Sequence, residues 1–324
     1  MPSASLRLLT WPEYVSPLTL KQFEREHQAL VEVEIVPSAV ELVERMQTAG
    51  VAVDVLVPPD YAVRELAAQN RLLPLDRSCL PNFRHLEPRF QQGRPHDPES
   101  RVSIIKDWGT TGILYRKDVV GEPPESWADF WKLAGSFVGR VTVLDSPGEV
   151  IGAALKMRGH SYNSCEPEHL SAAYTDLLRL EPLLLRFETN YKPLLASGEA
   201  CLALGWNGDA TALAAHGVPV GYVVPREGSQ LWEDDWAIAA DAPHAELAHA
   251  FLDFVLRPEI AAQEARYTRY ATGNHAALSL LDDALRNDPE TYPPAALLEE
   301  LEAGLPLPAE GQRRRAELWE SIRE

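Results

Sequence analysis

Segments with the period of a strand alternate with segments with the period of a helix along this chain, and that order restricts the folds open to it. Apolar and charged side chains alternate along residues 31–36, as in a half-buried strand. The run 53–57 is apolar apart from Asp54, which is typical of a strand covered on both faces. With a first short strand at residues 6–9, helices are predicted over residues 17–27, 39–48 and 62–68. A strand–helix series of this kind predicts an open, mainly parallel sheet flanked by helices.

The same alternation resumes after a loop rich in Pro, Arg and Asp between residues 81 and 101. Further strands are predicted over residues 112–115, 141–144, 201–204 and 218–224, and further helices over residues 127–134 and 150–158 and from about Asp209. A helical pattern from 245 to 265 is interrupted at Arg257-Pro258, because proline lacks the N–H that a helix interior needs. A chain of 324 residues has room for about two domains, so we expect an α/β fold of two lobes.

The charge balance limits the partners of this protein. The formal net charge is −18, with 48 acidic and 30 basic side chains. Nucleic acid is not an expected partner, because phosphate contacts depend on clustered Lys and Arg, whereas an acidic surface favours the approach of cations. The sequence has no stretch of about 18 consecutive apolar residues, so no membrane span is predicted. The start Met1-Pro2-Ser3 lacks the basic and apolar regions of a secretory signal, which fits a cytoplasmic protein or a chain from which the signal was removed.

The motifs of common enzyme classes are missing from the sequence. It contains no G-x-S-x-G, G-x-G-x-x-G, P-loop or H-E-x-x-H pattern. Cys79, Cys165 and Cys201 are far apart, which argues against a disulfide framework and a structural zinc site. His244 and His249 are five residues apart, off a common helical face, and are expected to face solvent. We therefore expect neither catalysis nor a metal or other cofactor.

Aromatic and acidic side chains recur just after the predicted strands, where ligands of open α/β sheets bind. Five of six such segments combine an aromatic residue with a carboxylate, and one brings two carboxylates; the segments are 11–14, 58–61, 107–112, 145–149, 205–209 and 232–236. A carboxylate accepts charge-assisted hydrogen bonds from a protonated amine, and an aromatic face attracts an ammonium by roughly 0.5–2 kcal/mol. The pattern therefore predicts a site for an organic cation.

Several of these residues also have a purely structural interpretation. Asp60 and Asp209 each stand where a residue can cap the following helix. Trp127 and Trp131 lie on a predicted helix and are expected to be core residues rather than ligand contacts.

Short motifs occur in a characteristic order from Leu6 to about Ala277 and, more weakly, to the end of the chain. They include residues 10–14 (Thr-Trp-Pro-Glu-Tyr), 54–58, 108–113, 126–129, 205–209, 224–228, 251–258 and 292–294. In these motifs the chain resembles the periplasmic spermidine/putrescine-binding proteins of polyamine ABC transporters. The resemblance implies a two-lobed type II periplasmic-binding-protein fold with hinge crossovers and a ligand cleft between the lobes. It implies an N-terminal lobe of residues 1–107 plus 235–280 and a C-terminal lobe of residues 108–234 plus 281–324.

Carried over by position, the resemblance also implies the ligand-binding residues. Aromatic contacts fall on Trp11, Tyr14, Tyr61, Trp206, Trp232 and Tyr270, and amine-binding carboxylates fall on Glu149 and Asp234. Glu13 occupies a position where some members place an Asp, and Asp60 of the segment 58–61 completes the candidate set.

Three departures from the family pattern leave the identity of the amine open. Pro59, Ser146 and about Leu305 stand where members place polar or acidic ligand contacts. The sequence also leaves the roles of Asp145, Asp235 and Trp236 open.

The resemblance implies a function in import rather than in catalysis. We expect the solute-binding component of an ABC importer, a monomer in the periplasm or at the cell surface whose signal peptide has been removed. It would capture spermidine or putrescine by hinge closure and deliver it to the permease subunits. The alternatives are another small amine or an amino acid such as γ-aminobutyrate, an opine, or an enzymatic role. Amino-acid binders need an Arg or Lys for the ligand's carboxylate, and the strand-end segments contain none.

Overall fold

The computed structural model describes residues 4–48 and 52–323. The chain divides into two compact units: unit 1 is Met1–Trp108 with Glu233–Asn287, and unit 2 is Gly109–Trp232 with Asp288–Glu324. The chain enters unit 2 within β4 (Ser103–Arg116) and returns within β9 (Gln230–Ile238). Residues 281–287 lie in unit 1, whereas the sequence-based division assigned them to the second lobe.

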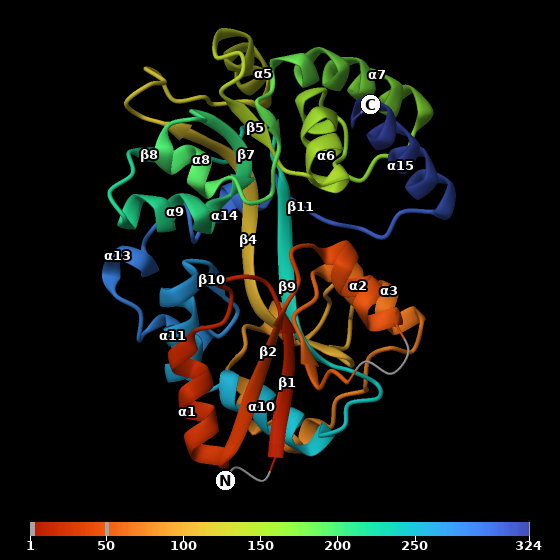
Figure 1. Cartoon of the computed structure of the whole chain (residues 1–324), viewed down its shortest axis with the longest axis vertical. Helices are drawn as coiled ribbons and strands as arrows, with labels where there is room; N and C mark the ends of the chain where they lie inside the picture. The colour runs from red at the N-terminus through yellow and green to blue at the C-terminus, as the bar shows by residue number, and fades with distance from the viewer. Residues whose placement is uncertain (1–3, 49–51, 324) are drawn as a thin grey trace. The chain divides into compact units, whose positions relative to one another are not determined.

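Unit 1 is built on a sheet whose first strands are parallel, as the alternation predicts. β1 (Ala4–Thr10) lies between β2 (Ala29–Ile35) and β3 (Val55–Leu56) and runs parallel to both. β9 pairs antiparallel with β3, and β10 (Ala271–Thr272) pairs antiparallel with β4. Figure 1 shows β1 and β2 in red next to α1. The helices of unit 1 are α1 (Pro17–His27), α2 (Ala39–Gln47), α3 (Asp60–Ala68), α4 (Pro88–Gln91), α10 (Ala245–Val255), α11 (Pro258–Thr268), α12 (His275–Leu278) and α13 (Asp283–Arg286), with the 3-10 helices η1 (Arg77–Cys79) and η2 (Pro81–His85).

Local signals begin and end these helices. The hydroxyl of Ser16 accepts a hydrogen bond from the N–H of Leu18 and Pro17 opens α1, a favourable helix start. Ser38 caps α2 in the same way by accepting from the N–H of Glu41. The predicted break at Arg257-Pro258 is confirmed, because α10 ends at Val255 and α11 begins at Pro258.

Two burial predictions for unit 1 are wrong. Residues 31–36 are predicted to form a half-buried strand. β2 stands at the end of the strand order, and its apolar side chains Val33 and Ile35 are 42% and 49% exposed. His249 is buried rather than solvent-facing, and its Nε2 accepts a hydrogen bond from the N–H of Asp76 at 3.0 Å. In both cases the exposure depends on what the rest of the chain does or does not place against the side chain, so the local pattern does not determine it.

Unit 2 contains a mixed sheet. The second half of β4 pairs antiparallel with β7 (Leu202–Trp206) and β8 (Val220–Val223). β5 (Val141–Val143) is parallel to β7 and to β6 (Arg186–Phe187), and β11 (Glu302–Ala303) is parallel to the start of β9. The helices of unit 2 are α5 (Trp127–Ser136), α6 (Pro147–Met157), α7 (Pro167–Leu180), α8 (Lys192–Ser197), α9 (Asn207–Ala215), α14 (Ala295–Leu298) and α15 (Ala309–Arg323), with the 3-10 helix η3 (Glu181–Leu183).

Each unit has its own apolar core. In unit 1 the core gathers β1, β3, α2 and α3 around side chains such as Leu9, Leu42 and Leu56. In unit 2 it includes Trp127, a confirmed core residue whose Nε1 donates to the carbonyl of Gly228 at 3.0 Å. Trp319 of the C-terminal α15 packs in the same core, so the last helix belongs to unit 2. No helix within residues 4–48 and 52–323 has the length and hydropathy needed to span a membrane.

Candidate ligand-binding residues

Three of the predicted residues meet in unit 1. Tyr14 lies in the turn between β1 and α1, Asp234 lies in β9, and Tyr270 directly precedes β10. The hydroxyl of Tyr14 donates to Oδ2 of Asp234 at 2.7 Å, and its ring packs edge-on against Tyr270 at 6.0 Å between centroids. Burial raises the pKa of Asp234 to about 7, although the hydrogen bond from Tyr14 acts in the opposite direction. This group therefore presents a half-buried carboxylate beside two phenol rings.

Asp60 lies next to this group, at the start of α3. Its side chain is buried, and Oδ1 accepts from the N–H of Tyr61 at 2.6 Å. The helix N-cap is Pro59 and Asp60 is the first residue of α3, so Asp60 is not the capping residue. Burial raises the pKa of Asp60 to about 8, and the nearby acidic groups Glu233 and Asp234 raise it further. Asp60 is therefore largely protonated at neutral pH.

An Asp60→Asn variant is expected to stabilise the ligand-free protein at high pH. The folded-state pKa of Asp60, about 8, lies above its ordinary value of 3.8, so its contribution to stability is full below pH 3.8 and is lost as pH rises through 8. Asparagine keeps the shape without the buried charge, which predicts a gain on the order of 1–3 kcal/mol at pH 9 and a smaller gain at pH 5. Melting temperatures at both pH values test this, and an equal effect at both would contradict it.

The remaining predicted residues of unit 1 are less enclosed. Trp11 is half-buried and packs against the unit 1 core. Glu13 is exposed and has a φ of 54°, which lies in the left-handed region that residues other than glycine rarely adopt. Tyr61 is 48% exposed. The part of these three side chains in binding stays a prediction.

Lys106 is a cation near the candidate residues that the sequence reasoning did not include. Its ammonium forms a close ion pair with Asp107, lies 3.9 Å from Glu264, and stands 4.1 Å from the centroid of the Tyr14 ring. The strand-end segment of the sequence analysis is 107–112, which begins one residue after Lys106 and so excludes this cation. A positive charge is therefore part of the unit 1 group that contains Tyr14 and Asp234.

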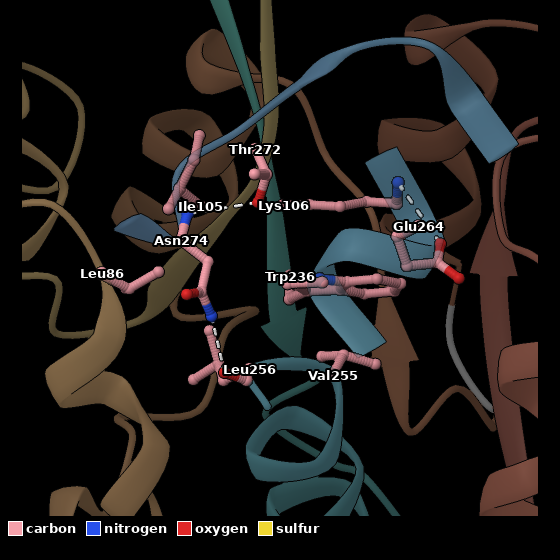
Figure 2. Close-up of a pocket in the computed structure, with 10 residues that line it drawn as sticks. Leu86, Ile105, Lys106, Trp236, Val255, Leu256, Glu264, Thr272 and Asn274 are labelled. Atoms are coloured by element: carbon pink, nitrogen blue, oxygen red, sulfur yellow. Dashed lines mark hydrogen bonds and ion pairs between the residues drawn. The ribbon is translucent and has the colours of Figure 1, made fainter. Parts of the chain in front are cut away.

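A small cavity lies beside Lys106 (Figure 2). The indole of Trp236 and the side chains of Glu264, Thr272 and Asn274 line it, and its volume is about 10 Å³. That volume admits about one water molecule, so this cavity is far too small for an organic amine. Trp236, whose role the sequence left open, is a wall of this cavity and packs edge-on against Phe251.

Asp235, the second residue left open, belongs to a buried ion-pair network. It is fully buried and accepts from Arg94 at 2.5 Å, from the ring Nε2 of His96 at 2.8 Å and from Ser103 at 2.7 Å. Burial acts to raise the pKa of Asp235, but Arg94 and His96 outweigh it and hold the pKa at about 2. His96 and Asp235 form, with Glu233, a cluster of metal-ligating groups. Because Arg94 already supplies the positive charge, the arrangement fits a structural ion pair and not a metal site.

In unit 2 the structure brings Glu149 and Trp206 together. Glu149 lies in the first turn of α6, and Trp206 is the last residue of β7. The indole Nε1 of Trp206 donates to Oε1 of Glu149 at 3.1 Å, and the hydroxyl of Tyr162 donates to Oε2 at 3.4 Å. The carboxamide of Gln230, with its nitrogen toward the carboxylate, donates to Oε2 at 2.8 Å. Burial raises the pKa of Glu149, and the hydrogen-bonding side chains of Thr111, Trp206 and Tyr162 act to lower it.

Trp232 is held against the main chain of β4. A Cβ atom at Gly109 would overlap the Trp232 ring and Oδ1 of Asn207, so glycine is required for this close approach. Asn207 in turn accepts from the N–H of Thr110 at 3.1 Å and donates to the carbonyl of Glu290 at 3.0 Å. Trp232 is thereby fixed in a buried position on β9, 8% exposed.

Two acidic residues near the candidate set have structural partners. Asp209 lies within the first turn of α9, whose N-cap is Trp206, so it is not the capping residue. It accepts from the hydroxyl of Tyr191 at 2.7 Å and pairs with Lys192 at 3.3 Å. Asp145, the third residue left open, pairs with Arg323 of α15 at 3.0 Å.

Comparison with known proteins identifies the family. The sequence profile of the family described as bacterial extracellular solute-binding protein matches residues 19–293. The spermidine/putrescine-binding periplasmic protein of Escherichia coli (strain K12) is 34% identical over 298 residues, which cover 91% of this chain and 85% of that protein. The putrescine/agmatine-binding protein of Pseudomonas aeruginosa is 30% identical over 336 residues, covering 98% and 92%.

A solved structure agrees with these sequence matches. The spermidine/putrescine ABC transporter substrate-binding protein PotD of Streptococcus pneumoniae is similar with a TM-score of 0.87 and 29% identity over 99% of each chain. The expected α/β fold of type II periplasmic binding proteins is thereby confirmed. The chain belongs to the bacterial extracellular solute-binding proteins, in the family that includes the spermidine/putrescine-binding periplasmic proteins.

Proposed function

We propose that this protein is the solute-binding component of an ABC importer and that it captures a polyamine, spermidine or putrescine. The observation that carries the proposal is two carboxylates with neutral hydrogen-bond donors, the half-buried Asp234 in unit 1 and the buried Glu149 in unit 2. Each accepts a hydrogen bond from an aromatic side chain, Tyr14 or Trp206. Neither forms an ion pair with a Lys, Arg or His of the described residues.

Carboxylates of this kind suit an ammonium ligand. Burial disfavours the ionised form of both groups, as their raised pKa values indicate. An arriving ammonium supplies the missing positive charge and forms charge-assisted hydrogen bonds. The rings of Tyr14, Tyr270 and Trp206 offer flat faces for the methylene chain and favour the cation further. The names of the relatives, which refer to spermidine, putrescine and agmatine, agree with this chemistry.

An amino-acid ligand is the alternative, and it requires a cation for the ligand's carboxylate. Lys106 is the cation nearest to Tyr14, but its ammonium already pairs with Asp107 and lies 3.9 Å from Glu264. A ligand carboxylate would have to compete with both of these buried acids. The polyamine is therefore the favoured ligand over γ-aminobutyrate or an opine.

The other parts of the proposal follow from the family. The relatives are named as periplasmic proteins and substrate-binding proteins of ABC transporters. We infer that this protein also acts in the periplasm or at the cell surface, without catalysis, and that permease subunits are its partners. Hinge closure on the ligand and a monomeric state are predictions of the same proposal.

Titration calorimetry of ligand-stripped protein tests the proposal. Stripping by unfolding and refolding matters because ligand from the expression host would block the site. We expect putrescine or spermidine to bind with micromolar or tighter affinity, while γ-aminobutyrate and arginine give no heat of binding. Absence of binding by putrescine, spermidine and spermine would contradict the proposal.

Replacing Asp234 is expected to weaken polyamine binding. Asp234→Ala removes a charge-assisted hydrogen bond worth about 1.5–3 kcal/mol, which corresponds to a loss of at least about tenfold in affinity. The exposed carboxylate of Glu44 on α2 supplies the control, because Glu44→Ala removes the same charge from unit 1 away from the group. Wild-type affinity in Asp234→Ala would exclude Asp234 from the site.

The affinity for the polyamine is also expected to depend on pH. Because the pKa of Asp234 is about 7, the group is protonated below pH 7, and an ammonium must displace that proton to bind. Affinity should therefore fall as pH decreases from 8 to 6, and this slope should become shallower in Asp234→Asn. Calorimetry at three pH values measures both slopes, and equal slopes would contradict the assignment.

A further inference from the structure

Glu149 is held by a set of neutral donors that the family resemblance did not suggest. Oε1 accepts from Trp206 at 3.1 Å and from the Gln230 amide at 3.1 Å, and Oε2 accepts from Gln230 at 2.8 Å and Tyr162 at 3.4 Å. The Gln230 amide also donates to the hydroxyl of Tyr162 at 2.6 Å. Trp206 is a predicted ligand contact. Tyr162 and Gln230 are buried, with exposed fractions of 4% and 7%. Both oxygens of Glu149 are therefore oriented by side chains with no charge.

The position of Tyr162 is fixed by its neighbours. Its ring packs on Gly152 of α6, where a Cβ atom would overlap the ring, so the helix admits the tyrosine only because residue 152 is glycine. The main-chain N–H of Tyr162 donates to Oε1 of Glu302 at 3.1 Å. Its carbonyl accepts from Nη2 of Arg315 at 2.7 Å. The hydroxyl is thus aimed from a segment that is anchored at both main-chain atoms.

Gln230 is anchored by the same C-terminal segment. It is the first residue of β9 and pairs in register with Glu302 of β11. Glu302 itself is held by Lys156 of α6 at 3.0 Å. The two donors therefore stand on a frame that links α6, β9 and β11, and this frame leaves their side chains little freedom to move away from Glu149.

We propose that Tyr162 and Gln230 are positioning residues that hold the carboxylate of Glu149 ionised and oriented for the ammonium group of the ligand. The inference rests on the proposed function, in which Glu149 binds the amine. Neutral donors stabilise the charged carboxylate without supplying a counter-charge, so the positive charge is left for the ligand to bring. A carboxylate that is already oriented also loses less freedom when the ligand binds, which favours affinity.

The first test needs no ligand and uses the indole of Trp206 as a reporter. The indole N–H donates directly to Glu149, so its ¹H–¹⁵N NMR signal will follow the ionisation of that carboxylate as pH changes. The chain has eight tryptophans, and the signal that is lost in Trp206→Phe is the one from Trp206. Tyr162→Phe and Gln230→Met each remove a donor to the ionised form and are expected to raise the titration midpoint by about one pH unit. Tyr174→Phe, a half-buried tyrosine of α7, is the control and should leave the midpoint unchanged. Wild-type midpoints in both variants would overturn the proposal.

The second test measures putrescine affinity in a double-mutant cycle. Tyr162→Phe is expected to weaken binding about tenfold in the wild-type background and to have little effect in a Glu149→Gln background, because the hydroxyl acts through the carboxylate. Equal losses in both backgrounds would overturn the positioning role. If wild-type protein binds no amine, the proposed function fails, while the NMR titration still decides whether these two residues control Glu149.

Discussion

An Arg94→Met variant is expected to lose about 3–5 kcal/mol in the free energy of unfolding of unit 1. The side chain of Arg94 is 1% exposed and that of its partner Asp235 is 0% exposed, with 2.5 Å between Nη1 and Oδ1. Methionine fills a similar volume but leaves Asp235 as a buried charge whose strongest partner is gone. Removing one member of a buried ion pair costs more than the pair contributes, because the remaining charge has lost its hydration as well.

The hydrogen bonds of Arg94 determine how a conservative change should behave. Nη2 donates to the carbonyl and the hydroxyl of Ser103, both at 3.0 Å, and lies 3.3 Å from the hydroxyl of Ser100. A lysine keeps the charge but has one ammonium in place of the two-armed guanidinium, so it cannot reach Asp235 and Ser103 together. Arg94→Lys is therefore expected to lose less stability than Arg94→Met but more than an exposed substitution.

The pH dependence gives this prediction a second check. The folded-state pKa of Asp235 is about 2, below its ordinary value of 3.8, so its stabilising effect is present above pH 3.8 and is lost as pH falls through 2. The difference between wild type and Arg94→Met should be largest near neutral pH and shrink below pH 4. Urea unfolding at several pH values measures this stability difference, and hydrogen exchange shows whether it lies in unit 1. The control is Arg84→Met, a substitution of an exposed arginine. Equal stability of Arg94→Met and wild type at pH 7 would contradict the prediction.

Lys106→Met is expected to have an effect of similar size, about 3–5 kcal/mol. The side chain of Lys106 is 1% exposed and lies between the carboxylates of Asp107 and Glu264, which are 1% and 5% exposed. Glu264 also accepts from the hydroxyl of Thr19 and from the N–H of Ser16, at the start of α1. Without the lysine, two buried acids would face each other with no cation between them.

The pH effect has the same sign as that for Arg94 but lies at higher pH, because the pKa values of the two acids beside Lys106 are raised and that of Asp235 is lowered. Burial raises the pKa of both Asp107 and Glu264, and Lys106 acts to lower it. In Lys106→Met both pKa values should rise further, so the variant loses stability as pH increases from 5 to 8. Thermal unfolding across this range tests the trend, with the exposed Lys21→Met as the matched control. A loss of stability that stays constant with pH would show that packing and not charge explains the effect.

Much of the fold was predictable because its signals are local. The strand–helix series of unit 1, the Ser16-Pro17 start of α1 and the break at Pro258 each depend on residues a few positions apart. Exposure was less predictable, since Ile35 has the pattern of a buried strand residue but lies on β2 at the end of the strand order.

Part of the candidate site could be predicted for the same reason. Tyr14 follows the first strand and Trp206 ends β7. Glu149 lies in the first helical turn after β5, the strand that pairs with β7, so the strand-end rule points to all three residues. Tyr162 lies in a loop that carries no such signal. It meets Gln230, 68 residues further along the chain, only because β11 aligns with the start of β9.

The sequence by itself determined the order of strands and helices, the excess of acidic groups and the set of aromatic and acidic residues from which a cation site could be built. It did not determine which of those acids already have a cation. The tertiary structure pairs Asp107, Asp209 and Asp235 with basic partners, and it leaves Asp234 and Glu149 with neutral donors. The physical reason is that an ion pair depends on the distance between two charges, and for Arg94 and Asp235 that distance joins residues 141 positions apart in the chain.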